Sequence, residues 1–209
     1  MNKKRIDWFD IVKRLKAISQ AGKFFAKDHF ELKRHEDIEH ITAEILAGHG
    51  QLDTEKTLHI LQEDTGYPTP KVDCRGVVFR DNKVLLVKEI ADGGWTFPGG
   101  WCDTGMTASE NVIREVREES GFEVKAVRLL AVYDRDRQGH CLPYPFSIYK
   151  IFFHCEIIGG AATPSDETSD VAFFAEDAIP PLSPGRTSAK QIKLFFDYYR
   201  NPNLPADFD

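Results

Sequence analysis

The sequence predicts a mixed α and β fold preceded by a small helical region. The first observation is a change of periodicity near Gly66–Pro70, where apolar residues at helical spacing give way to strand-like runs. The second is that two helical patterns, at about 108–120 and from about 188 onward, flank those runs. These patterns alone leave α/β and α+β open. We expect a helical domain over 1–66, a linker at 67–70 and a second domain over 71–209.

Three helices are expected before the linker. The first is predicted to end at Gly22, and the second to be capped by Asp28 with Glu31 and to end at Gly48. The third covers about 54–64. Their apolar faces carry Trp8, Val12, Leu15, Ile18, Ile38, Ile41, Ile45, Leu58 and Leu61.

These apolar rows exceed what three short helices can cover among themselves. Burial against a partner contributes about 25 cal/mol per Å², and closed twofold dimers are the commonest soluble assembly. We therefore expect a homodimer. The competing interpretation is that the helices pack only on the rest of their own chain, giving a monomer of 23.8 kDa.

Strands are expected over 72–79 and 83–89, with a tight turn at Asp81-Asn82 between them. Further strand-like runs lie at 127–134, 146–157 and 171–174. Thr187 or Ser188 is expected to cap a last helix. Its apolar face carries Ile192, Phe195, Phe196 and Tyr199.

The composition is typical of a globular protein without a membrane segment. The chain has 209 residues, 42% hydrophobic and 29% charged, with a net charge of −6. This charge argues against broad attraction to nucleic acid or an anionic membrane. No signal peptide and no long apolar run is recognisable, and the four cysteines form no C-x-x-C pair. We expect a cytoplasmic protein with reduced cysteines.

The most informative segment is a Gly-rich loop followed by an acidic helix at 99–122. Thr107 and Glu110 form a capping box, and Gly121 ends the helix. Glu115, Glu118 and Glu119 then fall within one arc of about 100°. Two interpretations of these three carboxylates remain open. In one they form a solvated acidic face, with Arg114 paired to Glu118. In the other they are ligands of a divalent cation such as Mg²⁺ or Mn²⁺, which prefer oxygen donors.

The same segment resembles the Nudix box, G-x5-E-x7-R-E-U-x-E-E-x-G-U, in which U is a bulky apolar residue. The matching residues are Gly100, Arg114, Glu115, Val116, Glu118, Glu119, Gly121 and Phe122. The first Glu of the box is replaced by Met106, and Asp103 is a partial substitute. The resemblance implies an α/β/α sandwich with a mixed sheet, and metal ligands at Glu115, Glu118 and Glu119.

The chemistry implied by this resemblance is metal-assisted phosphoryl transfer to water, with Glu118 and Glu119 in catalysis. Arg114 would orient the carboxylates, and Glu167, just ahead of the 171–174 strand, is the candidate general base or additional ligand. Candidate substrate-binding residues are Arg75, Lys88, Gly100 and Arg135. Solvated surface charge is the alternative interpretation for Arg75, Lys88, Glu167 and Arg135.

The helical N-terminal region and the 99–106 loop resemble the Nudix branch acting on nucleoside diphosphates linked to another group. ADP-ribose and CDP-choline both remain possible small-molecule substrates. Two further functions are possible: a metal-dependent enzyme that processes RNA ends, and a nucleotide sensor without turnover. The absence of a basic stripe argues against the first, and the intact Glu115, Glu118 and Glu119 argue against the second.

Overall fold

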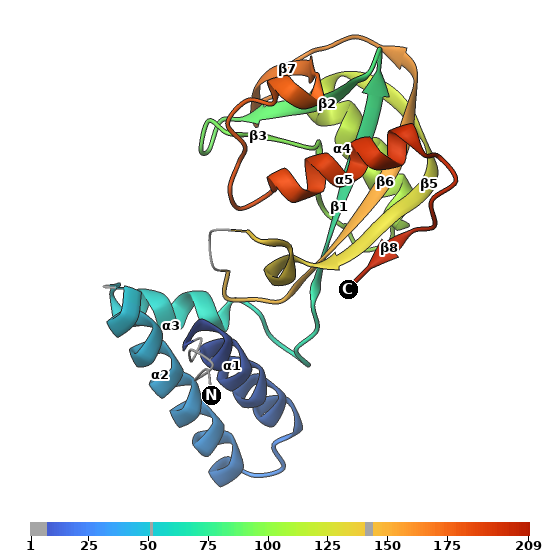
Figure 1. The fold of residues 1–209 in the computed structure, drawn as a ribbon. Coiled ribbons are helices and arrows are strands. Elements are labelled where there is room, and N and C mark those ends of the chain that lie inside the picture. Colours follow the sequence, from blue (N-terminus) through green and yellow to red (C-terminus); the bar gives the residue numbers. More distant parts are fainter. Residues whose placement is uncertain (1–7, 51, 141–143) are drawn as a thin grey trace, which may run out of the picture. The chain divides into compact units, whose positions relative to one another are not determined.

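A computed structural model describes residues 8–50, 52–140 and 144–209 (Figure 1). The chain divides into two compact units. The helical unit comprises Met1–Pro70 with Tyr144–Ser147, and the sheet unit comprises Lys71–Pro143 with Ile148–Asp209. Across the described residues, no helix has the length and apolar character needed to cross a membrane.

The helical unit contains α1 (Trp8–Phe25), α2 (His29–Gly50) and α3 (Thr54–Gln62), with α1 and α2 packed along each other (Figure 1). The predicted cap of α2 is confirmed, because the Glu31 amide donates to Asp28 at 2.8 Å. The predicted helix end at Gly22 is wrong. Gly22 lies inside α1, where a Cβ would sit 2.1 Å from the His35 ring, so this glycine permits close approach of α2.

The predicted apolar faces of these helices are only partly correct. Val12 and Leu61 are buried, but Trp8, Ile18 and Ile41 are 49%, 55% and 52% exposed. The interior is largely polar instead, since Glu39 accepts from Lys23 at 2.7 Å and from Gln62 at 3.0 Å. α2 also continues past the predicted end at Gly48 to Gly50, and the Leu52 amide donates to the Ala47 carbonyl beyond it.

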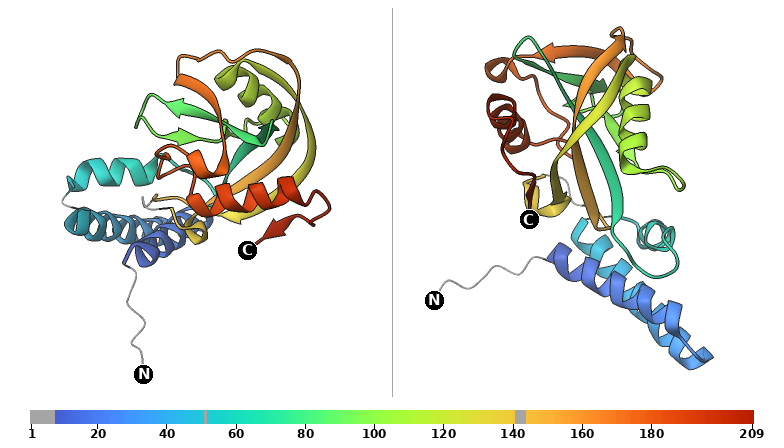
Figure 2. Two further views of the ribbon diagram at one scale, coloured as in Figure 1. Left: turned by 45° about the horizontal axis from the view of Figure 1, so that its top comes forward. Right: turned by 90° about the vertical axis from the view of Figure 1, so that its right-hand side faces the viewer.

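The sheet unit is built on one mixed sheet (Figure 2). Its strands are β1 (Lys71–Arg80), β2 (Lys83–Glu89), β3 (Trp95–Thr96), β4 (Gly99–Trp101), β5 (Phe122–Asp134), β6 (Ile148–Gly160), β7 (Thr168–Phe174) and β8 (Asp207–Phe208). The order is β3-β2-β1-β6-β5-β8, with β4 paired to β1 and β7 paired to β2. β1 runs parallel to β6 and antiparallel to β2 and β4.

Helices α4 (Ala108–Ser120) and α5 (Ala189–Arg200) lie on opposite faces of this sheet, as the right-hand view of Figure 2 shows. Val112 and Val116 of α4 pack in a core cluster with Cys74 and Val78 of β1. Ile192, Phe195 and Phe196 of α5 pack in a second cluster with Val77 and Phe152. The α/β/α arrangement implied by the Nudix resemblance is therefore observed.

Local predictions in this unit are largely confirmed. Asp81 and Asn82 both have positive φ, as a tight β1–β2 turn requires, and Ser188 caps α5. Tyr198, at 4% exposure, takes the buried position predicted for Tyr199, which is 39% exposed. β5 begins five residues before its predicted start, directly after Gly121, because it pairs with β6 as far as Gly160.

Candidate active site

The loop and helix at 99–122 fold as their sequence predicts. Thr107 accepts from the Glu110 amide at 3.2 Å, while the Glu110 carboxylate accepts from the Thr107 amide at 2.8 Å. Gly121 ends α4 with φ 75°, in the left-handed region. This reciprocal cap fixes where the helix begins, and therefore which side chains of its last turns face the loop.

Glu119 is the most buried of the three predicted ligands, with 8% exposure. Its Oε2 accepts from the Gly99 amide at 2.8 Å. Burial raises the pKa of Glu119 to about 8; Arg75 and the Gly99 amide oppose this, and the nearby Glu89 and Glu115 add to it.

Glu115 lies against Gly100. A Cβ on Gly100 would sit 2.8 Å from Glu115 Oε2, so a larger residue here would displace the Glu115 carboxylate. Burial raises the pKa of the Glu115 carboxyl, Arg114 opposes the rise, and Glu118 and Glu167 add to it. The side chain of Glu118 is 49% exposed.

Arg114 connects the helix to the loop. Its Nη2 lies 2.7 Å from Glu115 and 2.8 Å from Asp103, and its Nη1 lies 3.5 Å from Glu118. The structure thus contains both the bridge to the carboxylate cluster and the surface pair with Glu118. Asp103, the expected substitute for the missing acid at Met106, braces Arg114.

Asn111 is a site residue that the sequence analysis missed. Its side chain is fully buried, donates to the Trp101 carbonyl at 3.1 Å and accepts from the Asp103 amide at 3.1 Å. It also accepts from Arg114. The sequence feature that could have identified Asn111 is a polar residue next to Val112, within the apolar stripe of α4.

Arg75 lies on β1 and is 4% exposed. Its guanidinium makes a bidentate bond to Asp73, at 2.9 and 2.7 Å, and donates to the Phe97 carbonyl at 3.1 Å. Burial alone would lower the pKa of Arg75, but Asp73, Glu119 and Glu89 raise it. Arg75 therefore lies beside the predicted ligand Glu119. The other predicted phosphate-binding cation, Lys88, is half-buried on β2, opposite Asp170 of β7.

Glu167 is exposed in the turn before β7, and its carbonyl accepts from the Ile90 amide at 3.0 Å. Its charge adds to the upward pKa shifts of Glu115 and Glu89. Glu89, at the end of β2, was also missed by the sequence analysis. It is 7% exposed and pairs with Arg186 at 3.1 Å.

Arg135 is held in a short 3-10 helix, η1 (Arg135–Gln138), and is 5% exposed. It donates to the Gly185 carbonyl at 3.2 Å. Burial lowers the pKa values of His140 and Lys150, and the positive charge of Arg135 lowers them further. The structure thus brings Arg135 together with other basic groups.

The donor set of Glu115, Glu119 and their acidic neighbours fits a hard divalent cation. Such ions take carboxylate oxygens and complete their coordination with water and substrate phosphate. Among the described residues, no three His, Cys, Asp or Glu side chains converge closely enough to hold a metal by themselves. The fit is therefore to an ion bound by one or two carboxylates together with a phosphate substrate.

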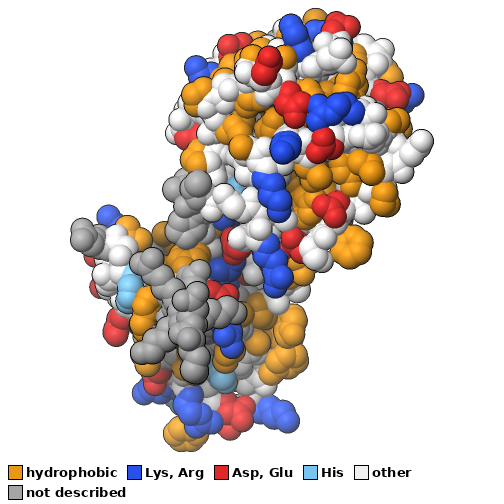
Figure 3. All heavy atoms as spheres, viewed as in Figure 1, with side chains coloured by type: hydrophobic (Ala, Val, Ile, Leu, Met, Phe, Trp, Pro, Cys, Tyr) orange, Lys and Arg blue, Asp and Glu red, His pale blue; other side chains and the backbone are white. Residues whose placement is uncertain are grey.

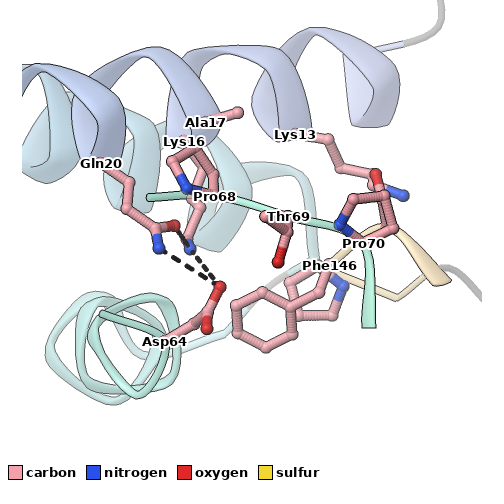
Figure 4. Close-up of a pocket in the computed structure, with 11 residues that line it drawn as sticks. Lys13, Lys16, Ala17, Gln20, Asp64, Pro68, Thr69, Pro70 and Phe146 are labelled. Carbon is pink, nitrogen blue, oxygen red and sulfur yellow. Dashed lines mark hydrogen bonds and ion pairs between the residues drawn. The ribbon is translucent and has the colours of Figure 1, made fainter. Parts of the chain in front are cut away.

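A separate pocket of about 100 Å³ lies within the helical unit (Figure 4). Lys16 lies 3.4 Å from Asp64 and 4.8 Å from the centre of the Phe146 ring, and Gln20 donates to Asp64 at 3.3 Å. None of the predicted site residues lines this pocket.

Comparison with known families identifies the class of protein. The NUDIX domain model matches residues 69–195, and a model described as a UDP-X-like, N-terminal oligomerisation domain matches residues 6–61. The chain therefore belongs to the Nudix hydrolase family, and its helical segment is of the UDP-X-like kind.

Individual relatives show which members of the Nudix family this chain is similar to. The chain is 42% identical to "Putative ADP-ribose pyrophosphatase YjhB" of Bacillus subtilis over the full length of both chains. A crystal structure of a UDP-X diphosphatase matches with a TM-score of 0.63 and 33% identity, covering 97% of this chain and 98% of the other. An ADP-ribose pyrophosphatase structure from Streptococcus suis matches with a TM-score of 0.61 and 38% identity, covering 68% and 100%.

Proposed function

We propose that this protein is a divalent-metal-dependent pyrophosphohydrolase acting on nucleoside diphosphates linked to another group, of the ADP-ribose or CDP-choline type. The observation that carries the proposal is the buried Glu119 carboxylate, fixed by the Gly99 amide and surrounded by further acidic groups. The ADP-ribose pyrophosphatase relatives support the substrate class.

Each residue has a part in this proposal. Glu115 and Glu119, with Glu118 beside them, would hold Mg²⁺ or Mn²⁺. The ion would supply charge neutralisation and acidify a bound water. Arg114 orients Glu115 and keeps it close to the loop.

The groups around these carboxylates complete the proposed site. Gly100 leaves room for Glu115, Arg75 contributes positive charge at the pyrophosphate, and Glu167 accepts the proton of the attacking water. Lys88 is proposed to contact phosphate oxygens.

The test is a panel of ADP-ribose, CDP-choline, UDP-sugars and a short capped RNA, each incubated with Mg²⁺, Mn²⁺ or a chelator. Release of a nucleoside monophosphate from the conjugates, with none in chelator, is the expected result. Full activity in chelator would overturn the metal assignment. Cleavage confined to RNA would replace the proposed substrate class by RNA-end processing.

A further inference from the structure

Arg186 lies in the segment that leads from β7 into α5, and the backbone of this segment is fixed against β3. The segment, orange-red in Figure 1, runs beside β3. The Ser183 amide donates to the Trp95 carbonyl at 2.9 Å. On the other side of Arg186, the hydroxyl oxygens of Thr187 and Thr96 lie 2.8 Å apart. The position of Arg186 is therefore set by contacts on both sides of it.

The guanidinium of Arg186 is held by two acids and still has an exposed part. Its Nε lies 3.1 Å from Glu89 Oε1, and its Nη1 lies 3.4 Å from Asp92 Oδ2. Nη1 also donates to the Ser183 hydroxyl at 3.4 Å. Among the described residues, Nη2 donates no hydrogen bond, and the side chain is 35% exposed. Since arginine carries five N–H donors, this side chain retains donor capacity toward solvent.

Glu89 connects Arg186 to the carboxylates of the proposed site. Glu89 is 7% exposed and lies opposite Thr168 in the β2–β7 register. The Thr168 hydroxyl donates to the Glu119 carbonyl at 2.8 Å, and neighbouring strands are about 4.8 Å apart. Burial raises the pKa of the Glu119 carboxyl, and the charge of Glu89 adds to the rise. Arg186 therefore borders, through Glu89, the carboxylate proposed to hold the metal.

The other two arginines of this site have less freedom to contact a substrate. All three guanidinium nitrogens of Arg75 donate within the protein, to Asp73 and to the Phe97 carbonyl, and the residue is 4% exposed. Arg114 contacts three acids of the loop and of α4. Arg75 thus acts on a phosphate through its charge, whereas Arg186 presents an exposed edge of a planar guanidinium, which matches phosphate oxygens.

We propose that Arg186 is a substrate-binding residue that donates from Nη2 to a phosphate oxygen of the pyrophosphate. This inference rests on the proposed function, which places the pyrophosphate beside Glu119. Glu89 and Asp92 hold the guanidinium in one orientation before the substrate arrives, so little side-chain freedom is lost on binding.

The test is steady-state kinetics with Mg²⁺ on the nucleoside diphosphate conjugate that the wild type cleaves. For Arg186→Gln we expect KM to rise roughly 10- to 100-fold with kcat nearly unchanged, because a charge-assisted hydrogen bond is lost from the ground state and the transition state alike. Arg186→Lys should give an intermediate KM, since it keeps the charge but not the planar fork. If Arg186→Gln does not fold, Arg186→Lys carries the same test.

Glu89→Gln separates substrate contact from a structural ion pair. Both Arg186→Gln and Glu89→Gln remove the 3.1 Å pair, but Glu89→Gln leaves the guanidinium in place and removes an acid that competes for it. We therefore expect Glu89→Gln to have a KM equal to or below that of the wild type. An equal rise of KM in both variants would overturn the inference and assign Arg186 a structural role.

Arg200→Gln is the matched control. Arg200 also pairs with two acids, Glu176 and Asp197, and its side chain is 48% exposed, so its replacement should leave KM unchanged. If the wild type cleaves no conjugate, the proposed function fails, and calorimetric binding of inorganic pyrophosphate with Mg²⁺ then tests Arg186. Weaker binding by Arg186→Gln than by the wild type and Arg200→Gln would support the contact, and equal binding by all three would overturn it.

Discussion

Glu119 is held by a 2.8 Å hydrogen bond from the Gly99 amide, and burial raises the pKa of its carboxyl. A glutamine has the same shape, and its amide oxygen can still accept from Gly99. We therefore expect Glu119→Gln to fold normally and to lose at least about 100-fold in turnover, because a metal oxygen is removed. Steady-state kinetics with Mg²⁺ and thermal unfolding measure the two effects.

Glu115→Gln should behave like Glu119→Gln. Glu123→Gln is the matched control, since Glu123 is an exposed acid on β5, and its activity should equal that of the wild type. A Glu119→Gln variant with full activity would show that this carboxylate holds no essential ion.

Glu167 lies close enough to Glu115 and Glu89 for its charge to act on both, and it is exposed before β7. We expect Glu167→Gln to lower kcat by roughly 10- to 100-fold with KM nearly unchanged, as removal of a general base does. Asp166→Asn, at the neighbouring position, is the control. Weaker substrate binding with unchanged kcat would instead make Glu167 a positioning residue.

The acidic side chains of α4 are predictable from the sequence, whereas Asn111, Asp73, Glu89 and Lys150 were not predicted. The carboxylates of α4 lie in one contiguous motif, so their spacing along one helix is enough to bring them together. Asp73 and Lys150 are 77 residues apart and become neighbours only through the parallel pairing of β1 and β6. No local pattern contains that information.

At the scale of elements, β1 and β6 are joined by the bond between Asp73 and Lys150 as well as by their backbones. Burial alone would raise the pKa of Asp73, but Arg75 and Lys150 outweigh it and hold the pKa at about 2. Because this value lies below that of the unfolded chain, the carboxylate stabilises the fold above about pH 4, and this contribution is lost as the pH falls toward 2.

We therefore expect the free energy of unfolding to decrease by about 2 kcal/mol from Asp73 alone between about pH 5 and pH 2. Urea unfolding at a series of pH values measures this loss. Asp73→Asn should be less stable at pH 7 and should show a shallower decline in acid. An identical pH slope in the variant would mean that Asp73 does not carry the effect.

Helix starts were predicted well where a side chain caps the backbone locally, as at Thr107 and Ser188. Helix ends at glycine were predicted well only where the glycine adopts positive φ, as at Gly121. Gly22 was also predicted to end a helix, but it lies inside α1. There the missing side chain lets His35 of α2 pack closely, and this contact depends on how the two helices pack. The short strands β4 and β8 were missed because they are defined by their partners.

At the scale of the whole molecule, the helical unit exposes large apolar side chains. Phe24, Phe25 and Tyr67 form an aromatic group with exposures of 55%, 62% and 56%, and their ring centres lie 4.9–6.3 Å apart. Hydrophobic side chains are visible at the surface in Figure 3. Residues 6–61 match a model described as an N-terminal oligomerisation domain, and the homodimer stays a prediction.

We expect light scattering to give twice the chain mass of 23.8 kDa. The double variant Phe24→Asp with Phe25→Asp should be monomeric, because it places charge in a desolvated interface. Ile158→Asp is the control, since Ile158 is 64% exposed on β6 and outside the helical unit. A monomeric wild-type protein would remove the dimer, and a double variant that stays dimeric would place the interface elsewhere. The domain limits 1–66 and 71–209 remain predictions.

The sequence by itself determined the β1–β2 hairpin and the capped acidic helix, and its Nudix box indicated the family and, through that resemblance, the α/β/α fold. Each depends on residues close together in the chain, where periodicity and capping chemistry act directly. The tertiary structure decided which distant charges meet: Arg75 with Glu119 and Asp73, and Lys150 with Asp73 and Arg135. It also decided that the helical unit is polar inside. These outcomes depend on strand register and helix packing, because neighbours in space are then separated by tens of residues in sequence.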